Sequence, residues 1–396
     1  MKQPFTTKLQ LLCRQMAQPL IFLALFFLIF CTLGHRMGVS NMLNTIMQTS
    51  YRLLIDTCLF LMSITVLSGA LGKLLVEFGV VNMLEKILRP LMKPLFHLPG
   101  VAALGAVLTF LSDNPAIISL AKDKEFSHYF KKYQLVSLTN FGTAFGMGLI
   151  VIVFMIALSD KVENASIGAF VGLAGAVIGS MVSTRLMQRF TLKSYPHFLT
   201  EPASDLTMIE GGAAEADMEV KKESTFIRAL NAILDGGKTG VDLGIAIIPG
   251  VLVISTSVML LTFGPSGANG EYTGAAYEGV RILPWLAGKI SVVFEWLFGF
   301  THPELVAFPI TALGAVGAAL GLVPAFVEQG LVDGNAIAVC TAIGMCWSGY
   351  LSTHTAMLDS LGYRKLIGKA VGAHTIGGLC AGIFAHWLYV LVTIIL

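Results

Sequence analysis

The chain has 396 residues, of which 55% are hydrophobic and 13% are charged, and its formal net charge at pH 7 is +2. Soluble domains carry roughly 25% charged residues, and the apolar residues here gather in runs of about 20, the length of a membrane-spanning helix. The alternating segments of about 10 residues that mark outer-membrane barrels are absent. We therefore expect an all-α polytopic membrane protein with the lipid bilayer, and not nucleic acid, as its surroundings.

The first apolar run covers residues 19–34 and follows a segment that carries Lys2, Lys8 and Arg14. A signal peptide would end in a small-x-small cleavage site, and none follows this run. We interpret residues 1–50 as an N-terminal cytoplasmic segment, an extra first transmembrane helix and an outer loop.

A second apolar run, residues 53–76, leads into residues 80–98, where basic and apolar residues are interleaved. Two prolines, Pro90 and Pro94, interrupt this stretch. The pattern predicts a broken amphipathic helix that lies at the membrane interface.

Residues 100–122 form an apolar segment that is broken by the sequence Ser112-Asp113-Asn114-Pro115. Proline removes a backbone donor and disfavours helix in the residue before it. The limb before the break has only about 11 residues, roughly half of what a spanning helix needs. The segment therefore predicts a re-entrant hairpin with its tip near the middle of the membrane.

The first half ends with two predicted helices, residues 133–158 and 165–187, which complete a repeat over residues 51–187. Residues 188–238 are polar and of mixed charge, which predicts a solvated cytoplasmic linker.

The second half, residues 239–396, repeats the order of the first. It has an apolar run (240–263), a glycine-rich loop, an interrupted amphipathic piece (281–298), an apolar segment broken by Pro309 and glycines (303–323), and two helices (335–358 and 367–395). If both broken segments are hairpins, most of the 26 Lys and Arg residues lie on the cytoplasmic side, as orientation rules favour. Each half then crosses an odd number of times, so the two repeats are inverted.

Interrupted segments at matching positions of inverted repeats indicate the substrate site of a secondary transporter, because helix ends there present unpaired backbone groups. Asp113 is an intramembrane carboxylate, which is a functional hypothesis by default. Glu304 follows a proline in the first turn of the second segment. The other polar residues expected at this site come from the hairpins and the helices after them: Ser112, Asn114, Thr139, Asn140, Thr143, Thr311, Ser348, Ser352, Thr353 and His354.

Two purely structural roles remain open for these residues. Small and hydroxyl residues in membrane helices commonly serve helix packing, and His354 could be a satisfied interior histidine. An intramembrane enzyme is the rival class, but no zinc-ligand spacing, H-E-x-x-H or G-x-S-x-G motif occurs. We expect no metal, cofactor or catalytic residue.

Three stretches resemble the nucleoside-recognition or Gate-domain superfamily, which includes concentrative nucleoside transporters and spore-maturation membrane proteins. Leu111-Ser112-Asp113-Asn114-Pro115 is similar to the first hairpin tip of those transporters, with a hydroxyl and then a carboxylate before proline. Pro303-Glu304-Leu305-Val306-Ala307-Phe308 resembles their second hairpin motif, and Asn231–Val251 resembles the start of a Gate repeat.

The resemblance implies secondary transport of a small polar, nucleoside-like solute by alternating access, coupled to sodium or protons, in the bacterial inner membrane. It implies solute-binding roles for Ser112, Asp113 and Glu304. Leu111 and Pro303 differ from the transporters' glutamine and asparagine, which leaves the solute open. The spore-maturation members keep a second function open, a Gate-type component that acts in assembly, signalling or envelope maturation without transport. Homo-oligomer formation is left open as well.

Overall fold

The computed structural model describes residues 5–203 and 224–395, with residues 5–15 described by their backbone alone. The predicted all-α membrane fold is confirmed: these ranges contain helices and one isolated β-bridge, between Lys131 and Pro202, but no strand. Seven helical segments in them are long and apolar enough to cross a membrane: Met16–Met37, Val39–Glu77, Lys132–Ile156, Ala165–Ser194, Thr225–Thr262, Gly334–Ser360 and Arg364–Ile395.

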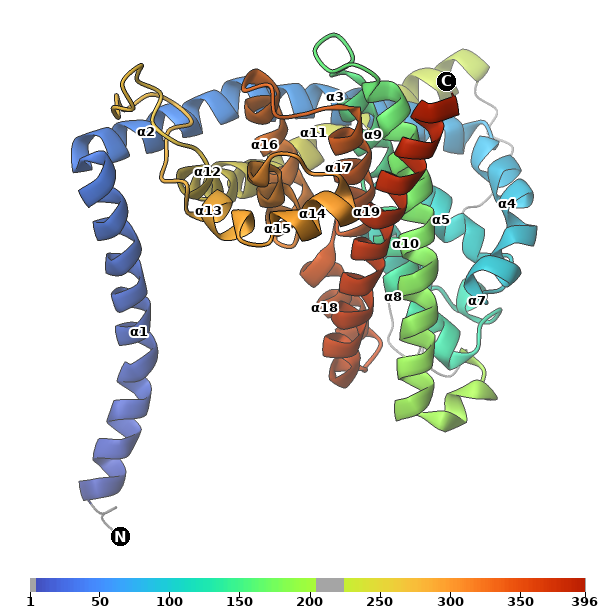
Figure 1. Ribbon diagram of the computed structural model, residues 1–396. Coiled ribbons are helices and arrows are strands. Elements are labelled where there is room, and N and C mark those ends of the chain that lie inside the picture. Colours follow the sequence, from blue (N-terminus) through green and yellow to red (C-terminus); the bar gives the residue numbers. More distant parts are fainter. Residues whose placement is uncertain (1–4, 204–223, 396) are drawn as a thin grey trace.

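The first helix, α1 (Phe5–Met37), stands apart from the body of the molecule (Figure 1). Only 6% of its apolar window is buried. It meets the rest of the chain at its C-terminal end, where Leu33 and Met37 pack against Met42.

Two long helical segments form an antiparallel pair. The first joins α2 (Val39–Arg52), the π-helical η1 (Leu53–Cys58) and α3 (Leu59–Glu77); the second joins α11 (Thr225–Gly250), the π-helical η4 (Val251–Ser255) and α12 (Thr256–Thr262). Glycines allow the backbones of α3 and α11 to touch, because a Cβ atom at Gly240 would overlap the carbonyl of Thr65. The Thr65 hydroxyl also donates to the carbonyl oxygen of Gly240 at 2.7 Å.

Both ends of the predicted linker over residues 188–238 are helical in the structure. α10 (Ala165–Ser194) runs further than expected, and α11 begins at Thr225, where the Ser224 hydroxyl accepts from the N–H of Ile227 at 3.4 Å. Ala232 and Gly236 of α11 are buried, so one side of this part of the linker packs, while most of its other residues remain exposed. Residues 204–223 lie outside the described residues.

The amphipathic stretch is a single helix, α4 (Val80–Phe96), so the predicted break at its prolines was wrong. Pro90 and Pro94 both lie on the exposed side of α4. The carbonyl groups that lose their helical partner there can be solvated, so the helix continues through both residues.

Both broken segments are interrupted as predicted. In the first half α5 (Ala102–Leu111) and α6 (Pro115–Lys122) flank the break. In the second half η5 (Pro303–Val306) and α15 (Ala307–Ala312) precede the break, and α16 (Val316–Glu328) follows it. Pro309 does not cause the second interruption, because it stands in the first turn of α15, where its missing N–H costs little.

The two helices predicted over residues 133–158 and 335–358 are also broken, which the sequence interpretation missed. The first divides into α8 (Lys132–Thr143) and α9 (Gly148–Ile156), the second into α17 (Gly334–Cys346) and α18 (Tyr350–Ser360). Met147 adopts a left-handed conformation (φ 56°) at the first of these breaks.

The last helices of the two halves, α10 and α19 (Ile367–Ile395), pack side by side through glycines: a Cβ atom at Gly179 would lie 2.6 Å from the carbonyl oxygen of Gly377.

The two halves follow the same order of elements, and each holds three of the seven candidate spans. The remaining short helices are α7 (Lys124–Ser127), η2 (Pro196–Leu199), α13 (Ile282–Gly288), α14 (Ser291–Phe298) and η6 (Arg364–Leu366).

Candidate functional site

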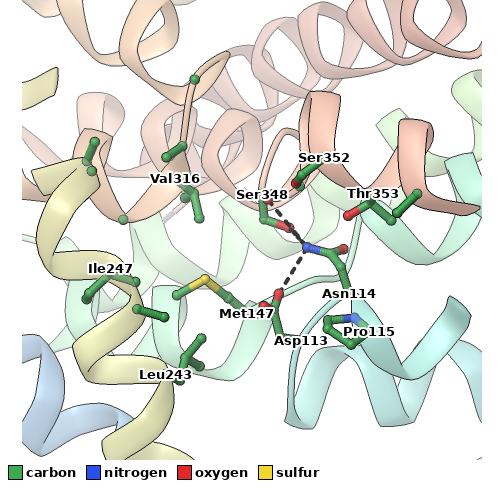
Figure 2. A pocket seen from close by; sticks show the side chains of 18 of the residues that line it. Asp113, Asn114, Pro115, Met147, Leu243, Ile247, Val316, Ser348, Ser352 and Thr353 are labelled. Carbon is green, nitrogen blue, oxygen red and sulfur yellow. Dashed lines mark hydrogen bonds between the residues drawn. The ribbon is translucent and has the colours of Figure 1, made fainter. Parts of the chain in front are cut away.

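A cavity of about 420 Å³ opens where the two hairpin breaks face each other (Figure 2). The breaks of both hairpins, the breaks of the two divided helices and one side of α11 all contribute to it. Its lining consists of Asp113, Asn114, Pro115, Ile118, Met147, Leu243, Ala246, Ile247, Gly250, Gly314, Ala315, Val316, Gly317, Ala318, Ser348, Gly349, Ser352, Thr353 and Ala356.

Asn114 joins the first hairpin to the second half of the chain. Its side chain is only 5% exposed, and its amide Nδ2 donates to the Ser348 hydroxyl at 3.3 Å and to the Asp113 carboxylate at 3.0 Å (Figure 2). The Ser348 hydroxyl donates in turn to the carbonyl oxygen of Thr143 at 3.1 Å. The Asn114 amide oxygen is buried and finds no partner among the described residues.

Glycines in the divided helices make room for Asn114. A Cβ atom at Gly146 would overlap both the Asn114 amide oxygen and the Ser348 hydroxyl. A Cβ atom at Gly349 would lie 2.5 Å from the Asn114 amide nitrogen. The two unpredicted helix breaks therefore sit where the hairpin side chain enters, so they form part of the site.

Asp113 supplies the only carboxylate of the cavity lining in the described part of the chain, and no Lys or Arg lines it. The side chain is half-buried and receives the Asn114 amide. A carboxylate in such a place is costly unless hydrogen-bond donors or a cation approach it. Asp113 is therefore placed to accept donors from a molecule that enters the cavity.

Five of the residues predicted from the sequence line the cavity: Asp113, Asn114, Ser348, Ser352 and Thr353. Three other predicted hydroxyls do not. Those of Ser112, Thr143 and Thr311 each donate to the carbonyl oxygen four residues earlier in the chain, at 2.5 to 2.7 Å. This local bond satisfies the hydroxyl within its own helix and turns it away from the cavity.

Three further predicted residues, Thr139, Asn140 and His354, are fully buried away from the lining. The Asn140 amide nitrogen donates to the hydroxyl of Ser183 and to the carbonyl oxygen of Ala370, both at 2.9 Å. The Nδ1 atom of His354 contacts the carbonyl oxygen of its own helix at 2.5 Å. The Asn140 bonds join α8 to α10 and α19, and the His354 ring lies 4.5 Å from the ring of His374 in α19.

Glu304 was expected in the cavity and lies outside its lining. Its carboxylate is bonded to the guanidinium of Arg281, next to α13, and is only 6% exposed. The residue precedes the second hairpin break by about two helical turns, which separates it from the tip. It is a buried ion-pair partner of Arg281, at the start of the amphipathic piece over residues 281–298.

The sequence interpretation missed the apolar side of the cavity. Leu243 and Ile247 come from α11, and Met147 comes from the break between α8 and α9 (Figure 2). Apolar residues in a membrane helix carry no signal that separates a cavity wall from a lipid-facing surface. From the second hairpin segment, the sequence marked two lining residues, Gly314 and Gly317, as part of the interruption.

Comparison with known proteins finds a family match in the part of the chain that contains the first hairpin. Residues 58–159 match the family model for Gate, described as nucleoside recognition. The resemblance to Gate proteins is thereby confirmed for this region. It covers the first hairpin and the divided helix that follows it. An uncharacterised protein of Alkalihalophilus pseudofirmus is 36% identical over 90 residues, which is 22% of this chain and 19% of that protein, so the chain spans about a fifth of that relative's length.

The fold also has solved counterparts. A structure of CNTnw in an inward-facing, substrate-bound state matches with a TM-score of 0.51 at 14% identity, covering 82% of this chain and 74% of that one. A variant of CNTnw in its intermediate 1 state matches with a TM-score of 0.49 at 14% identity, covering 82% and 75%. The first match shows that this chain has a fold like that of CNTnw. The chain is thus a multi-pass membrane protein with this fold.

Proposed function

We propose that this protein is a secondary transporter that binds a small polar solute between its two hairpins. One observation carries the proposal: the broken ends of both hairpins and of both divided helices line one cavity, which holds Asp113 and Asn114. Four interrupted helices at one place leave backbone donors and acceptors free for a solute. The proposed function involves no catalysis. Among the described residues, no group of three His, Cys, Asp or Glu side chains is placed to hold a metal ion.

The chemistry of the lining indicates the class of solute. The cavity combines one carboxylate with the hydroxyls of Ser352 and Thr353 and an apolar wall on α11. A solute that offers hydroxyl or amino donors to Asp113, together with an apolar face, is complementary to this lining. A nucleoside has both features. A phosphorylated solute would place its charge beside the carboxylate without any lining cation, so it should be rejected.

Alternating access would require the cavity to open to either side of the membrane in turn, with sodium or protons as the coupling ion. We place the protein in the bacterial inner membrane with its N-terminus in the cytoplasm. The orientation rests on the Lys and Arg distribution, and the coupling rests on the resemblance to secondary transporters. Neither argument concerns homo-oligomer formation.

Thermal unfolding with a panel of nucleosides and other small metabolites tests the proposal, since a solute that binds the folded state must stabilise it. The wild-type protein should gain stability with its solute, and Asp113→Asn should lose that gain while it keeps its own melting temperature. Asp160→Asn, at an exposed loop carboxylate, is the matched control and should behave like wild type.

Proteoliposome uptake then separates transport from binding. Uptake of the same solute, lost in Asp113→Asn, supports the transporter. Binding without uptake at any sodium or proton gradient would favour the second function, a Gate-type membrane component without transport. Wild-type affinity in Asp113→Asn would remove Asp113 from the site.

A further inference from the structure

The amphipathic helix α4 presents three distinct faces. Val81, Met92 and Phe96 are buried against the hydrophobic clusters that include α5. A second face consists of large apolar side chains on successive turns, which remain exposed: Met83 (55%), Ile87 (60%) and Leu91 (44%). In a membrane protein, an apolar face that no other part of the described chain covers is placed to contact lipid.

The third face of α4 is basic and lies beside the apolar one. Lys86, Arg89 and Lys93 follow one another at spacings of three and four residues, so they share a stripe along the helix, and all three are exposed. A helix that carries an apolar stripe next to a basic one is typical of the boundary between acyl chains and anionic headgroups.

A second cavity, of about 440 Å³, opens at the end of this basic stripe. Arg89, Pro90 and Lys93 of α4 line one side, and the turn before α5 with Tyr129 lines the other. Tyr129 is 64% exposed, so an aromatic ring stands at the rim of the cavity. This cavity shares no residue with the one at the hairpin tips.

The Arg89 guanidinium is held in place by an ion pair with Glu85, one turn earlier on α4. Its Nε and Nη2 atoms both lie 2.9 Å from one carboxylate oxygen of Glu85, which is buried. The arginine side chain itself is 59% exposed, so its remaining N–H groups are free to reach a ligand in the cavity. An arginine fixed in this way loses little freedom when it binds a phosphate oxygen.

Further positive charge gathers at the same end of α4. Arg185 of α10 donates to the carbonyl oxygens of Pro94 and Leu95. Partial burial lowers the pKa of His97, and the charges of Arg185 and Arg189 lower it further. The surroundings of the cavity therefore have a positive potential that favours an anion.

We propose that this cavity binds the phosphate headgroup of an anionic phospholipid, with Arg89 and Lys93 on the phosphate and the acyl chains along Met83, Ile87 and Leu91. The cavity alone would suit a free phosphate, but the adjoining uncovered apolar stripe commits the site to a lipid. A bound lipid would fix α4, and with it the hairpin α5–α6, to the bilayer. The proposal is independent of what the central cavity transports.

The test uses the full chain in a neutral detergent, with phosphatidylglycerol, phosphatidylcholine of the same acyl chains, or glycerol 3-phosphate added. Phosphatidylglycerol should raise the melting temperature more than phosphatidylcholine does, and glycerol 3-phosphate should have little effect. Lys93→Gln should remove at least half of that difference, and Lys93→Arg should retain it. Lys86→Gln removes the same charge from the same stripe outside the cavity and should have a smaller effect.

Native mass spectrometry gives a second measurement that does not depend on melting. Lys93→Gln should retain fewer phosphatidylglycerol molecules than Lys86→Gln at equal lipid concentration. Equal losses in the two variants would show a diffuse charge effect and overturn the proposal. Equal stabilisation by the two lipids would overturn it too, and stabilisation by glycerol 3-phosphate alone would assign the cavity to free phosphate instead.

Discussion

The Asn114 amide and the Ser348 hydroxyl are hydrogen-bonded at 3.3 Å, although 234 residues separate them in the chain. Asn114 belongs to the first hairpin and Ser348 to the break between α17 and α18. Because Ser348 also donates to the carbonyl oxygen of Thr143, this bond links the broken elements of both halves at one point. A change in the arrangement of the hairpins relative to the divided helices must alter this contact. Substitutions next to the Asn114–Ser348 bond should therefore perturb the site.

Gly146→Ala should abolish solute binding. The added Cβ atom would overlap the Asn114 amide and the Ser348 hydroxyl, so Asn114 must leave its position. Forcing an extra methyl into a packed site costs about 1 to 3 kcal/mol, which should lower the melting temperature without preventing folding. Solute-dependent thermal stabilisation measures the loss.

Gly372→Ala is the control for Gly146→Ala, because a Cβ atom at Gly372 meets nothing within 4 Å. It should bind solute like wild type. Unchanged binding in Gly146→Ala would show that the Asn114 position is unimportant for the solute.

Gly240→Ala should destabilise the pair formed by α3 and α11. Its Cβ atom would overlap the backbone of Thr65, and the helices must separate to admit it. Gly237→Ala, almost one turn earlier on the same helix, places its Cβ atom 3.8 Å from Val66, which is an ordinary contact. We expect a loss of about 1 to 3 kcal/mol for Gly240→Ala and little change for Gly237→Ala in thermal unfolding. Equal melting temperatures would contradict the close approach of the two helices.

Glu278 makes the loop over residues 263–281 sensitive to acid. The carboxylate is buried, which alone would raise its pKa, but hydrogen bonds from Ser266 and Thr273 outweigh burial and lower the pKa to about 2. A pKa below the ordinary value of 4.5 in the folded state means that the charged form stabilises the fold above about pH 4.5. That contribution is lost as the pH falls from about 4.5 toward 2.

Glu278→Gln should therefore destabilise the protein at neutral pH, by about 2 kcal/mol for the lost charged hydrogen bonds. Melting curves between pH 7 and 3 should converge for the variant and wild type as the pH falls. Glu271→Gln, at an exposed position in the same loop, should show neither effect. A pH-independent gap between Glu278→Gln and wild type would rule out the carboxylate charge as the cause.

The proposed topology can be tested with single cysteines. His128 and Asn269 are both exposed, and the orientation given above puts His128 in the cytoplasm and Asn269 outside. In a cysteine-free chain, an impermeant thiol reagent should label Asn269→Cys in intact cells and His128→Cys only after the membrane is opened. Ser127 is unsuitable because it is buried. Labelling of His128→Cys from outside would overturn the re-entrant hairpin orientation.

The sequence predicted those features that depend on chain length and on polar residues in apolar surroundings. The first hairpin followed from a half-length limb ending before Pro115, and Asp113 and Asn114 followed from their position at that break. The divided helices could not be predicted, since Gly146 and Gly349 have the spacing of ordinary packing glycines, and their breaks depend on the side chain that enters from the hairpin. Glu304 was misplaced because its proline marks the start of a helix and not the position of the tip.

The long pair of helices has a consequence for the membrane around it. The segment Val39–Glu77 has 39 residues and is thus about 58 Å long, nearly twice the hydrocarbon thickness of about 30 Å. Large apolar side chains are exposed along both α2 and α3, and the polar side chains of Asn44, Gln48 and Arg52 are exposed on the α2 end. A helix of this length fits within the hydrocarbon only when it is steeply inclined, by roughly 60° from the normal. In Figure 1 it runs across the direction of α10 and α19, so those helices cannot share its slope. The protein therefore covers a much wider area of membrane than seven upright helices would, and displaces correspondingly more lipid.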